Sequence, residues 1–291
     1  MLDLTTQILA FGLFVSGVVF GYWRWIKPRQ RQLSQSAVGL LVLLVLTLMG
    51  GFIGAPIWWV DAEQSFAWDL PPLASRMLAV ASWTFALVFF LTLKRPTNQR
   101  VRLALILLNV YLWPLALAIV GRHLDRFDFS KSITYGFFVI AIGMAAAGLW
   151  FLWRQPNLET ERTITQPAPA TLPRVWLSIV AMVTGLWGLA LFLTDDGPST
   201  LIWVWPGDLL TSRLIAVMLW AIAAGALYAM RYRDTASIML TAMMVYGVGV
   251  ALATGWNAFW GLPVRLSYFV AFLSMGLVSA MMLKMQQDAI A

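Results

Sequence analysis

The chain has 291 residues, of which 60% are hydrophobic and 11% charged, and it contains 16 tryptophans, one histidine and no cysteine. This composition leaves too little polar surface to coat a soluble globule of that length, so it predicts an integral membrane protein. The lack of cysteine excludes disulfides, thiolate metal sites and thiol nucleophiles.

Apolar stretches of about the ~20 residues that a helix needs to cross a bilayer recur along the whole chain. They cover approximately residues 6–26, 37–59, 73–94, 102–121, 133–153, 174–194, 211–230, 236–255 and 264–285. We therefore predict an all-α, polytopic transmembrane protein with nine spans. An odd number of spans places the two termini on opposite sides of the membrane.

Basic residues gather in alternate loops. The side that carries the C-terminus holds 14 of the 20 lysines and arginines, and the other side holds nine of the 13 acidic residues. Because positive residues stay cytoplasmic, the C-terminus is predicted inside and the N-terminus outside. The net charge of +7 then reflects topology and does not indicate a nucleic-acid partner.

One segment occurs twice without a gap. Residues 68–83 read WDLPPLASRMLAVASW, and residues 205–220 read WPGDLLTSRLIAVMLW. Weaker matches flank it, with Val110-Tyr111 repeated as Val245-Tyr246 and Gly143 as Gly276. Equivalent spans lie four apart, so both copies have the same orientation, as in parallel transporter repeats.

This match predicts four regions. They are an N-terminal transmembrane helix with a basic cytoplasmic loop (1–36), a first four-helix repeat (37–154), a Pro/Thr-rich cytoplasmic linker (155–173) and a second four-helix repeat (174–291). The linker composition is typical of an extended segment.

Each copy places an arginine, Arg76 or Arg213, a few residues inside a span, where lipid and the helix dipole both disfavour a cation. We expect the carboxylates of the preceding loops to neutralise them, with a lipid phosphate or a bound anion as the alternative. The loop carboxylates concerned are Asp69 and Asp208, with Asp61 and Asp195 further upstream. Ser75 and Ser212, which directly precede the arginines, are predicted to cap their helices.

Trp68 and Trp205 open the two copies and stand in loops rich in aromatic and acidic residues. Such loops are expected to lie along the outer membrane interface, with the rings among the headgroups. The alternative is a pair of flaps that cover a site between the repeats. The candidate ligand-binding residues are Arg76, Arg213, Trp68, Trp205, Asp69 and Asp208.

Two glycine pairs stand near the outer ends of equivalent spans, Gly51 with Gly54 and Gly185 with Gly188. Small residues let helices approach closely in lipid, so we expect these pairs to pack the two halves together, with ligand contact as the alternative. His123 is the only histidine and is predicted to be a surface loop residue.

The motif Trp-x-x-x-x-Leu-x-Ser-Arg ahead of an apolar helix resembles one in uncharacterised bacterial multi-pass membrane proteins, where a Trp/Pro-rich external loop leads into a Leu-x-x-Arg helix start. The resemblance covers residues 68–83 and 205–220. It implies a bacterial cytoplasmic membrane and no activity.

No Asp or Glu falls in the middle of a predicted span, and neither a metal-binding cluster nor a cofactor motif is present. The sequence thus predicts no enzyme, no metal and no cofactor. We expect a module that binds lipid, a hydrophobic ligand or partner membrane proteins, including a second copy, at the repeat interface. The alternative is a transporter or channel for an anionic or amphipathic solute, with Arg76 and Arg213 in one external vestibule.

Overall fold

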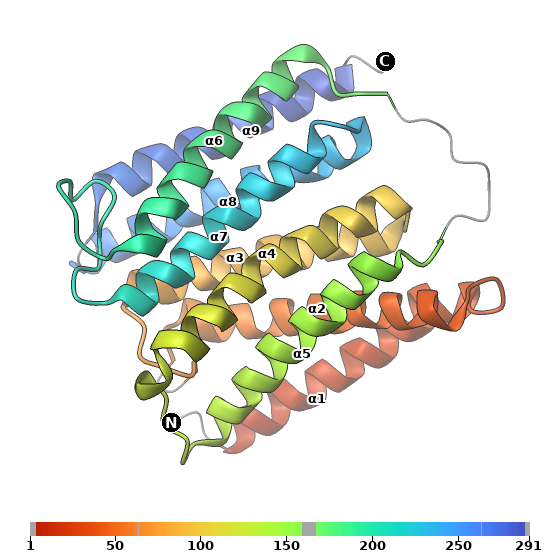
Figure 1. The fold of residues 1–291 in the computed structure, drawn as a ribbon, viewed down its shortest axis with the longest axis horizontal. Helices are drawn as coiled ribbons and strands as arrows, with labels where there is room; N and C mark the ends of the chain where they lie inside the picture. The colour runs from red at the N-terminus through yellow and green to blue at the C-terminus, as the bar shows by residue number, and fades with distance from the viewer. Residues whose placement is uncertain (1–3, 63–64, 159–166, 263, 289–291) are drawn as a thin grey trace.

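The computed structural model describes residues 4–62, 65–158, 167–262 and 264–288, and it contains only helical regular structure in these ranges. Nine of the helices in these ranges are long and apolar enough to cross a membrane. They are α1 (Leu4–Gly21), α2 (Gln35–Trp59), α3 (Pro72–Lys94), α4 (Asn98–Arg122), α5 (Ser132–Arg154), α6 (Thr171–Leu193), α7 (Leu209–Ala229), α8 (Arg233–Phe259) and α9 (Leu266–Asp288). The all-α membrane class predicted from composition is therefore confirmed (Figure 1).

The helices run side by side between two ends, and α1 begins at the end opposite to the one where α9 finishes (Figure 1). We call one the loop end, since it carries the α2–α3, α4–α5, α6–α7 and α8–α9 connections, and the other the linker end, since α5 ends and α6 begins there. The charge of the loops predicts that the linker end faces the cytoplasm.

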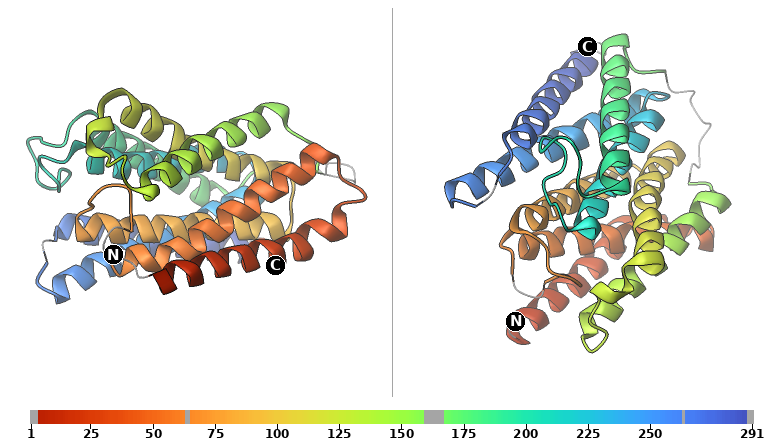
Figure 2. Two further views of the ribbon diagram at one scale, coloured as in Figure 1. Left: turned by 90° about the horizontal axis from the view of Figure 1, so that it is seen from below. Right: turned by 60° about the vertical axis from the view of Figure 1, so that its left-hand side comes forward.

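Two sets of helices pair in the same way. In the first half (α2–α5), α2 packs on α3 and α4 on α5; in the second half (α6–α9), α6 packs on α7 and α8 on α9. The halves meet where α3 contacts α8 and α4 contacts α7, and α1 lies outside against α2 (Figure 2). This pairing of the helices agrees with the sequence repeat, which stays a prediction.

Apolar side chains cover the outside of this bundle as well as its core. Exposed large apolar residues occur along α1, α5, α6 and α9, for example Phe11, Val139, Leu186 and Val270. Helix α7 is the most enclosed, with Leu214, Ile215 and Val217 all fully buried. An apolar surface around an apolar core is what a bilayer solvent requires.

Helix starts follow ordinary capping chemistry, but not at the predicted serines. Helix α3 begins at Pro72, whose missing N–H suits a first turn, and Asp208 caps α7 by accepting from the Thr211 N–H at 3.2 Å. The prediction that Ser75 and Ser212 are caps is wrong, because both lie inside their helices. Ser75 instead donates to the Trp58 carbonyl at 2.8 Å, which ties α3 to the end of α2.

The predicted linker is shorter than expected, since α6 already begins at Thr171. Residues 155–158 and 167–170 have no helix, and residues 159–166 lie outside the described ranges. Both described parts are held by hydrogen bonds. The Leu158 N–H donates to the Asn98 side chain at 3.1 Å, and the Arg233 N–H donates to the Pro167 carbonyl at 2.9 Å.

The expectation that the glycine pairs pack the two halves together is wrong. A Cβ at Gly51 would lie 3.0 Å from the Ser82 carbonyl of α3, and one at Gly188 would lie 2.9 Å from the Ala216 carbonyl of α7. A Cβ at Gly185 would likewise meet α7, and one at Gly54 would meet Trp58 of its own helix. These glycines therefore serve contacts inside each half, α2 with α3 and α6 with α7.

Close approach between the halves depends on two other glycines. A Cβ at Gly249 of α8 would lie 2.5 Å from Val80 of α3, and one at Gly225 of α7 would lie 2.7 Å from Leu107 of α4. These are the two helix pairs that join the halves.

Candidate functional site

Arg76 lies in the first turns of α3 and is only 7% exposed. Its guanidinium Nη1 donates to the Oδ1 atom of Asn257 on α8 at 2.5 Å and to the Pro72 carbonyl at 3.3 Å. Its Nε has no partner among the described residues. The main contact of this arginine is therefore with the opposite half.

Arg213 occupies the equivalent place on α7 and is 8% exposed. Its Nη1 lies 2.6 Å from Nε2 of His123, the residue directly after α4. Its Nε donates to the Phe192 carbonyl at 3.1 Å, and the guanidinium lies over the Phe192 ring at 5.3 Å. This arginine also reaches across to the opposite half.

The two contacts are reciprocal. The arginine of the first half binds the third helix of the second half near its loop end, and the arginine of the second half binds the residue directly after the third helix of the first half. Arginine only donates, so Nε2 of His123 must accept, which requires a neutral imidazole with its proton on Nδ1. Two buried cations are thus held by neutral acceptors across the seam between the halves.

The expected pairing with loop carboxylates is not what the structure shows. In the described parts of the chain, neither Arg76 nor Arg213 has a carboxylate oxygen within 4.0 Å. Asp69 is exposed, and Asp208 caps α7 and lies 3.6 Å from Arg126. The carboxylates whose charges act on the two arginines are the more distant Asp61 and Asp195.

The two motif tryptophans are buried, 6% exposed at Trp68 and 7% at Trp205, so the expectation that their rings lie among headgroups is wrong. Trp68 packs edge-on against Phe66, Phe127 and Phe137, with ring centroids 4.4 to 5.6 Å apart. Trp205 packs against Tyr268 of α9 at 6.0 Å. Each loop therefore folds down onto the last helix of its own half.

The loop between α2 and α3 covers an apolar cavity of about 340 Å³ inside the first half. Ser65 and Phe66 line it from this loop, Leu78 and Ala81 from α3, Tyr111 from α4 and Phe137 from α5. Ile140 of α5 also lines it and is 59% exposed, so the cavity reaches the lipid-facing surface of the bundle. Its size and lining are those of a hydrophobic ligand site.

In the first half α5 packs less closely on α4 than α9 packs on α8 in the second half. Gly247 of α8 lets α9 approach so closely that a Cβ there would lie 2.6 Å from the Gly276 nitrogen. The residue after Tyr111, which matches Gly247, is Leu112, and a Cβ at Gly143 of α5 would meet nothing within 4 Å. A bulky leucine therefore replaces the glycine crossing, and space opens beside Tyr111.

Sequence reasoning missed both partners of the arginines. His123 is half-buried and bonded to Arg213, which corrects the prediction of a surface loop residue, and Asn257 is 1% exposed. A signal was present, because Gly121-Arg122-His123 and Gly255-Trp256-Asn257 stand at the ends of matching spans. Their different chemistries hid the correspondence.

We expect His123→Leu to destabilise the protein by about 1–3 kcal/mol, since it leaves a buried guanidinium without its acceptor. His123→Asn, which reproduces the acceptor that Arg76 already uses, should cost less than half of that. Thermal unfolding in detergent measures both variants. Equal losses would show that the hydrogen bond to Arg213 contributes nothing.

The same contact predicts a pH dependence. Burial and the positive charge of Arg213 hold the pKa of His123 below its ordinary value of 6.5, and nearby Asp125, Arg126 and Asp208 add smaller effects. The unfolded chain then binds more protons than the folded one between the lowered pKa and 6.5, so stability rises with pH through that window. We expect the melting temperature to fall on acidification below pH 6.5 and to fall less in His123→Asn. An equal fall in both would assign the effect to other groups.

No protein-family model, curated protein or solved structure matches this chain.

Proposed function

We propose that this integral membrane protein is a non-catalytic module that binds the hydrocarbon chain of a membrane lipid in the cavity of its first half. The observation that carries the proposal is the apolar cavity of about 340 Å³ between α2, α3, α4 and α5. A hydrocarbon chain that leaves the bilayer and enters the cavity contacts apolar side chains there too, namely those of Leu78, Phe85, Leu115 and Phe137. Its binding free energy therefore comes from close packing and from the shape of the cavity.

The cavity also offers a place for a polar head. The hydroxyls of Ser65, Ser82 and Tyr111 stand among otherwise apolar side chains. Within the described part of the chain only the Ser82 hydroxyl forms a hydrogen bond, which it donates to the Gly51 carbonyl at 3.0 Å. An ester or hydroxyl group next to the chain fits these donors. The expected ligand is therefore a chain with a weakly polar end.

This proposal moves the binding site away from the seam between the halves. Arg76 and Arg213 are buried there and bonded to Asn257 and His123, which leaves little of either guanidinium for a lipid headgroup. We assign them the role of polar ties that fix how the halves meet. The same engagement argues against one shared vestibule for an anionic solute.

Lipid extraction tests the proposal. The protein is reconstituted into nanodiscs of bacterial polar lipids, transferred into mild detergent and analysed by native mass spectrometry. We expect at least one chain-bearing lipid per protein to survive detergent exchange. Complete loss of lipid at detergent concentrations that leave the protein folded would contradict it.

A further inference from the structure

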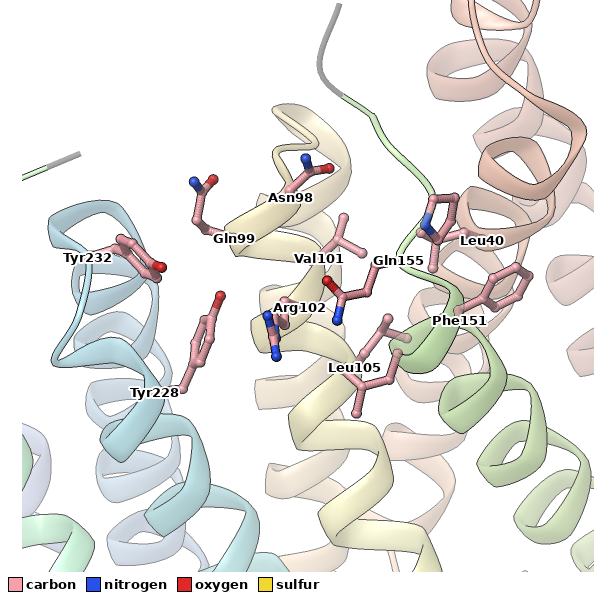
Figure 3. A pocket seen from close by; sticks show the side chains of 12 residues that line it. Leu40, Asn98, Gln99, Val101, Arg102, Leu105, Phe151, Gln155, Tyr228 and Tyr232 are labelled. Atoms are coloured by element: carbon pink, nitrogen blue, oxygen red, sulfur yellow. The ribbon is translucent and has the colours of Figure 1, made fainter. Parts of the chain in front are cut away.

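A second cavity, of about 210 Å³, lies at the linker end between the start of α4 and the ends of α5 and α7 (Figure 3). Its residues come from both halves, with Gln99 and Arg102 on α4 and Tyr228 and Tyr232 on or after α7. Among the described residues that line it, Arg102 is the only charged one. The cavity is therefore electropositive.

Arg102 can bind a ligand because the nearby carboxylate, that of Asp234, is bound by Arg100. Arg100 binds Asp234 of α8 with both Nε and Nη2, the Nε contact being 2.5 Å. Arg102 makes no hydrogen bond or ion pair with any residue in the described ranges, and its side chain is exposed. Figure 3 shows it between Tyr228 and Gln155.

Five further polar side chains line this cavity, namely Asn98, Gln99, Gln155, Tyr228 and Tyr232. The hydroxyls of Tyr228 and Tyr232 form no hydrogen bond to the described part of the chain, and both face the space beside α4 (Figure 3). The side-chain amide of Gln155, next to Arg102 in Figure 3, forms no hydrogen bond to the described residues either. The site thus offers a guanidinium and two phenols as donors, and one amide oxygen as an acceptor.

This combination selects a ligand that is anionic and also carries a hydroxyl. A phosphate accepts from a guanidinium and from phenols through charge-assisted hydrogen bonds, and a neighbouring hydroxyl can donate to the side-chain oxygen of Gln155. Leu40, Val101, Leu105 and Phe151 add apolar surface on the side toward the bundle centre. The ends of spanning helices, where these residues stand, lie at headgroup depth.

We propose that this cavity binds a glycerol phosphate group. The group comes either from the headgroup of phosphatidylglycerol or from free glycerol phosphate. The site is at the opposite end of the bundle from the apolar cavity, so it stands or falls independently of the lipid chain proposed above.

The test compares Arg102→Gln and the pair Tyr228→Phe with Tyr232→Phe against wild type and Arg95→Gln. Arg95 is exposed at the same end of the bundle and does not line the cavity, so its variant controls for a lost surface charge. Each protein is placed in nanodiscs of equal phosphatidylglycerol and phosphatidylcholine, and lipid retained after detergent exchange is measured by native mass spectrometry. A second arm titrates free glycerol 3-phosphate in a thermal shift assay.

We expect wild type and Arg95→Gln to retain phosphatidylglycerol over phosphatidylcholine, and Arg102→Gln to lose that preference by about tenfold or more. The phenylalanine pair should lose part of it. A thermal shift with glycerol 3-phosphate, absent in Arg102→Gln, would support the site with a soluble ligand as its source. An equal loss in Arg95→Gln, or no preference and no shift in wild type, would overturn the proposal.

Discussion

Filling the cavity of the first half with Ala81→Met and Ala141→Met is expected to expel the bound lipid chain while the protein stays folded. Both alanines line the cavity and are nearly buried, and the second half already carries methionine, Met218, where the first has Ala81. Because the chain enters from the bilayer, what it loses is packing contacts of about 0.1–0.2 kcal/mol per atom pair, and the loss of about ten such pairs lowers affinity by about tenfold. Native mass spectrometry of detergent-exchanged protein measures the retained lipid.

Val139→Met is the matched control, because it adds the same side chain to the lipid-facing surface of α5, where Val139 is 72% exposed. This variant should retain lipid as wild type does. If Ala81→Met with Ala141→Met also retains it, the chain is held elsewhere and the cavity is not the site.

Gly247→Ala is expected to destabilise the protein although it adds only one methyl group. A Cβ at Gly247 would run into the backbone of α9, at the Phe272 carbonyl and 2.6 Å from the Gly276 nitrogen, and backbone cannot move aside as a flexible side chain can. Overpacking of this kind costs about 1–3 kcal/mol. Thermal unfolding in detergent should show a clearly lower melting temperature.

Gly255→Ala tests the reason on the same helix. A Cβ at Gly255 would meet nothing within 4 Å, and alanine is the better helix former by about 1 kcal/mol. This control should therefore be neutral or stabilising. If both variants lose stability equally, the close crossing of α8 and α9 is not what holds the second half together.

The sequence predicts the nine spans well because each one is a local property, a run of apolar residues long enough for a bilayer. Their observed ends differ by only a few residues, as at Thr171, where α6 begins three residues ahead of the prediction. The two arginines could also be singled out, because a cation inside an apolar run is visible without knowledge of its partners.

The partners could not be found in this way. Asn257 and Arg76 are 181 positions apart. A sequence favours carboxylates in the nearest loop as partners of an arginine, because an opposite charge close by can be recognised without knowledge of the fold. The structure satisfies the arginines with a neutral amide and a neutral imidazole from the opposite half. This choice depends on how α3 meets α8 and α4 meets α7, which no local pattern encodes.

The cavity illustrates the same limit. It depends on one difference between matching positions, Leu112 in the first half and Gly247 in the second, and on the resulting separation of α4 and α5. The difference is visible in the sequence, but its effect on the distance between two helices depends on how the helices pack. The motif tryptophans were misplaced for the same reason, since their burial depends on aromatic neighbours from α5 and α9.

The central claim, that the first half holds a lipid chain, is tested most directly by a cryo-electron microscopy map of the protein in lipid nanodiscs. We predict elongated density between Leu78, Tyr111 and Phe137 that opens to the bilayer beside Ile140. A map in which α5 closes onto α4 and leaves no space beside Tyr111 would contradict the claim.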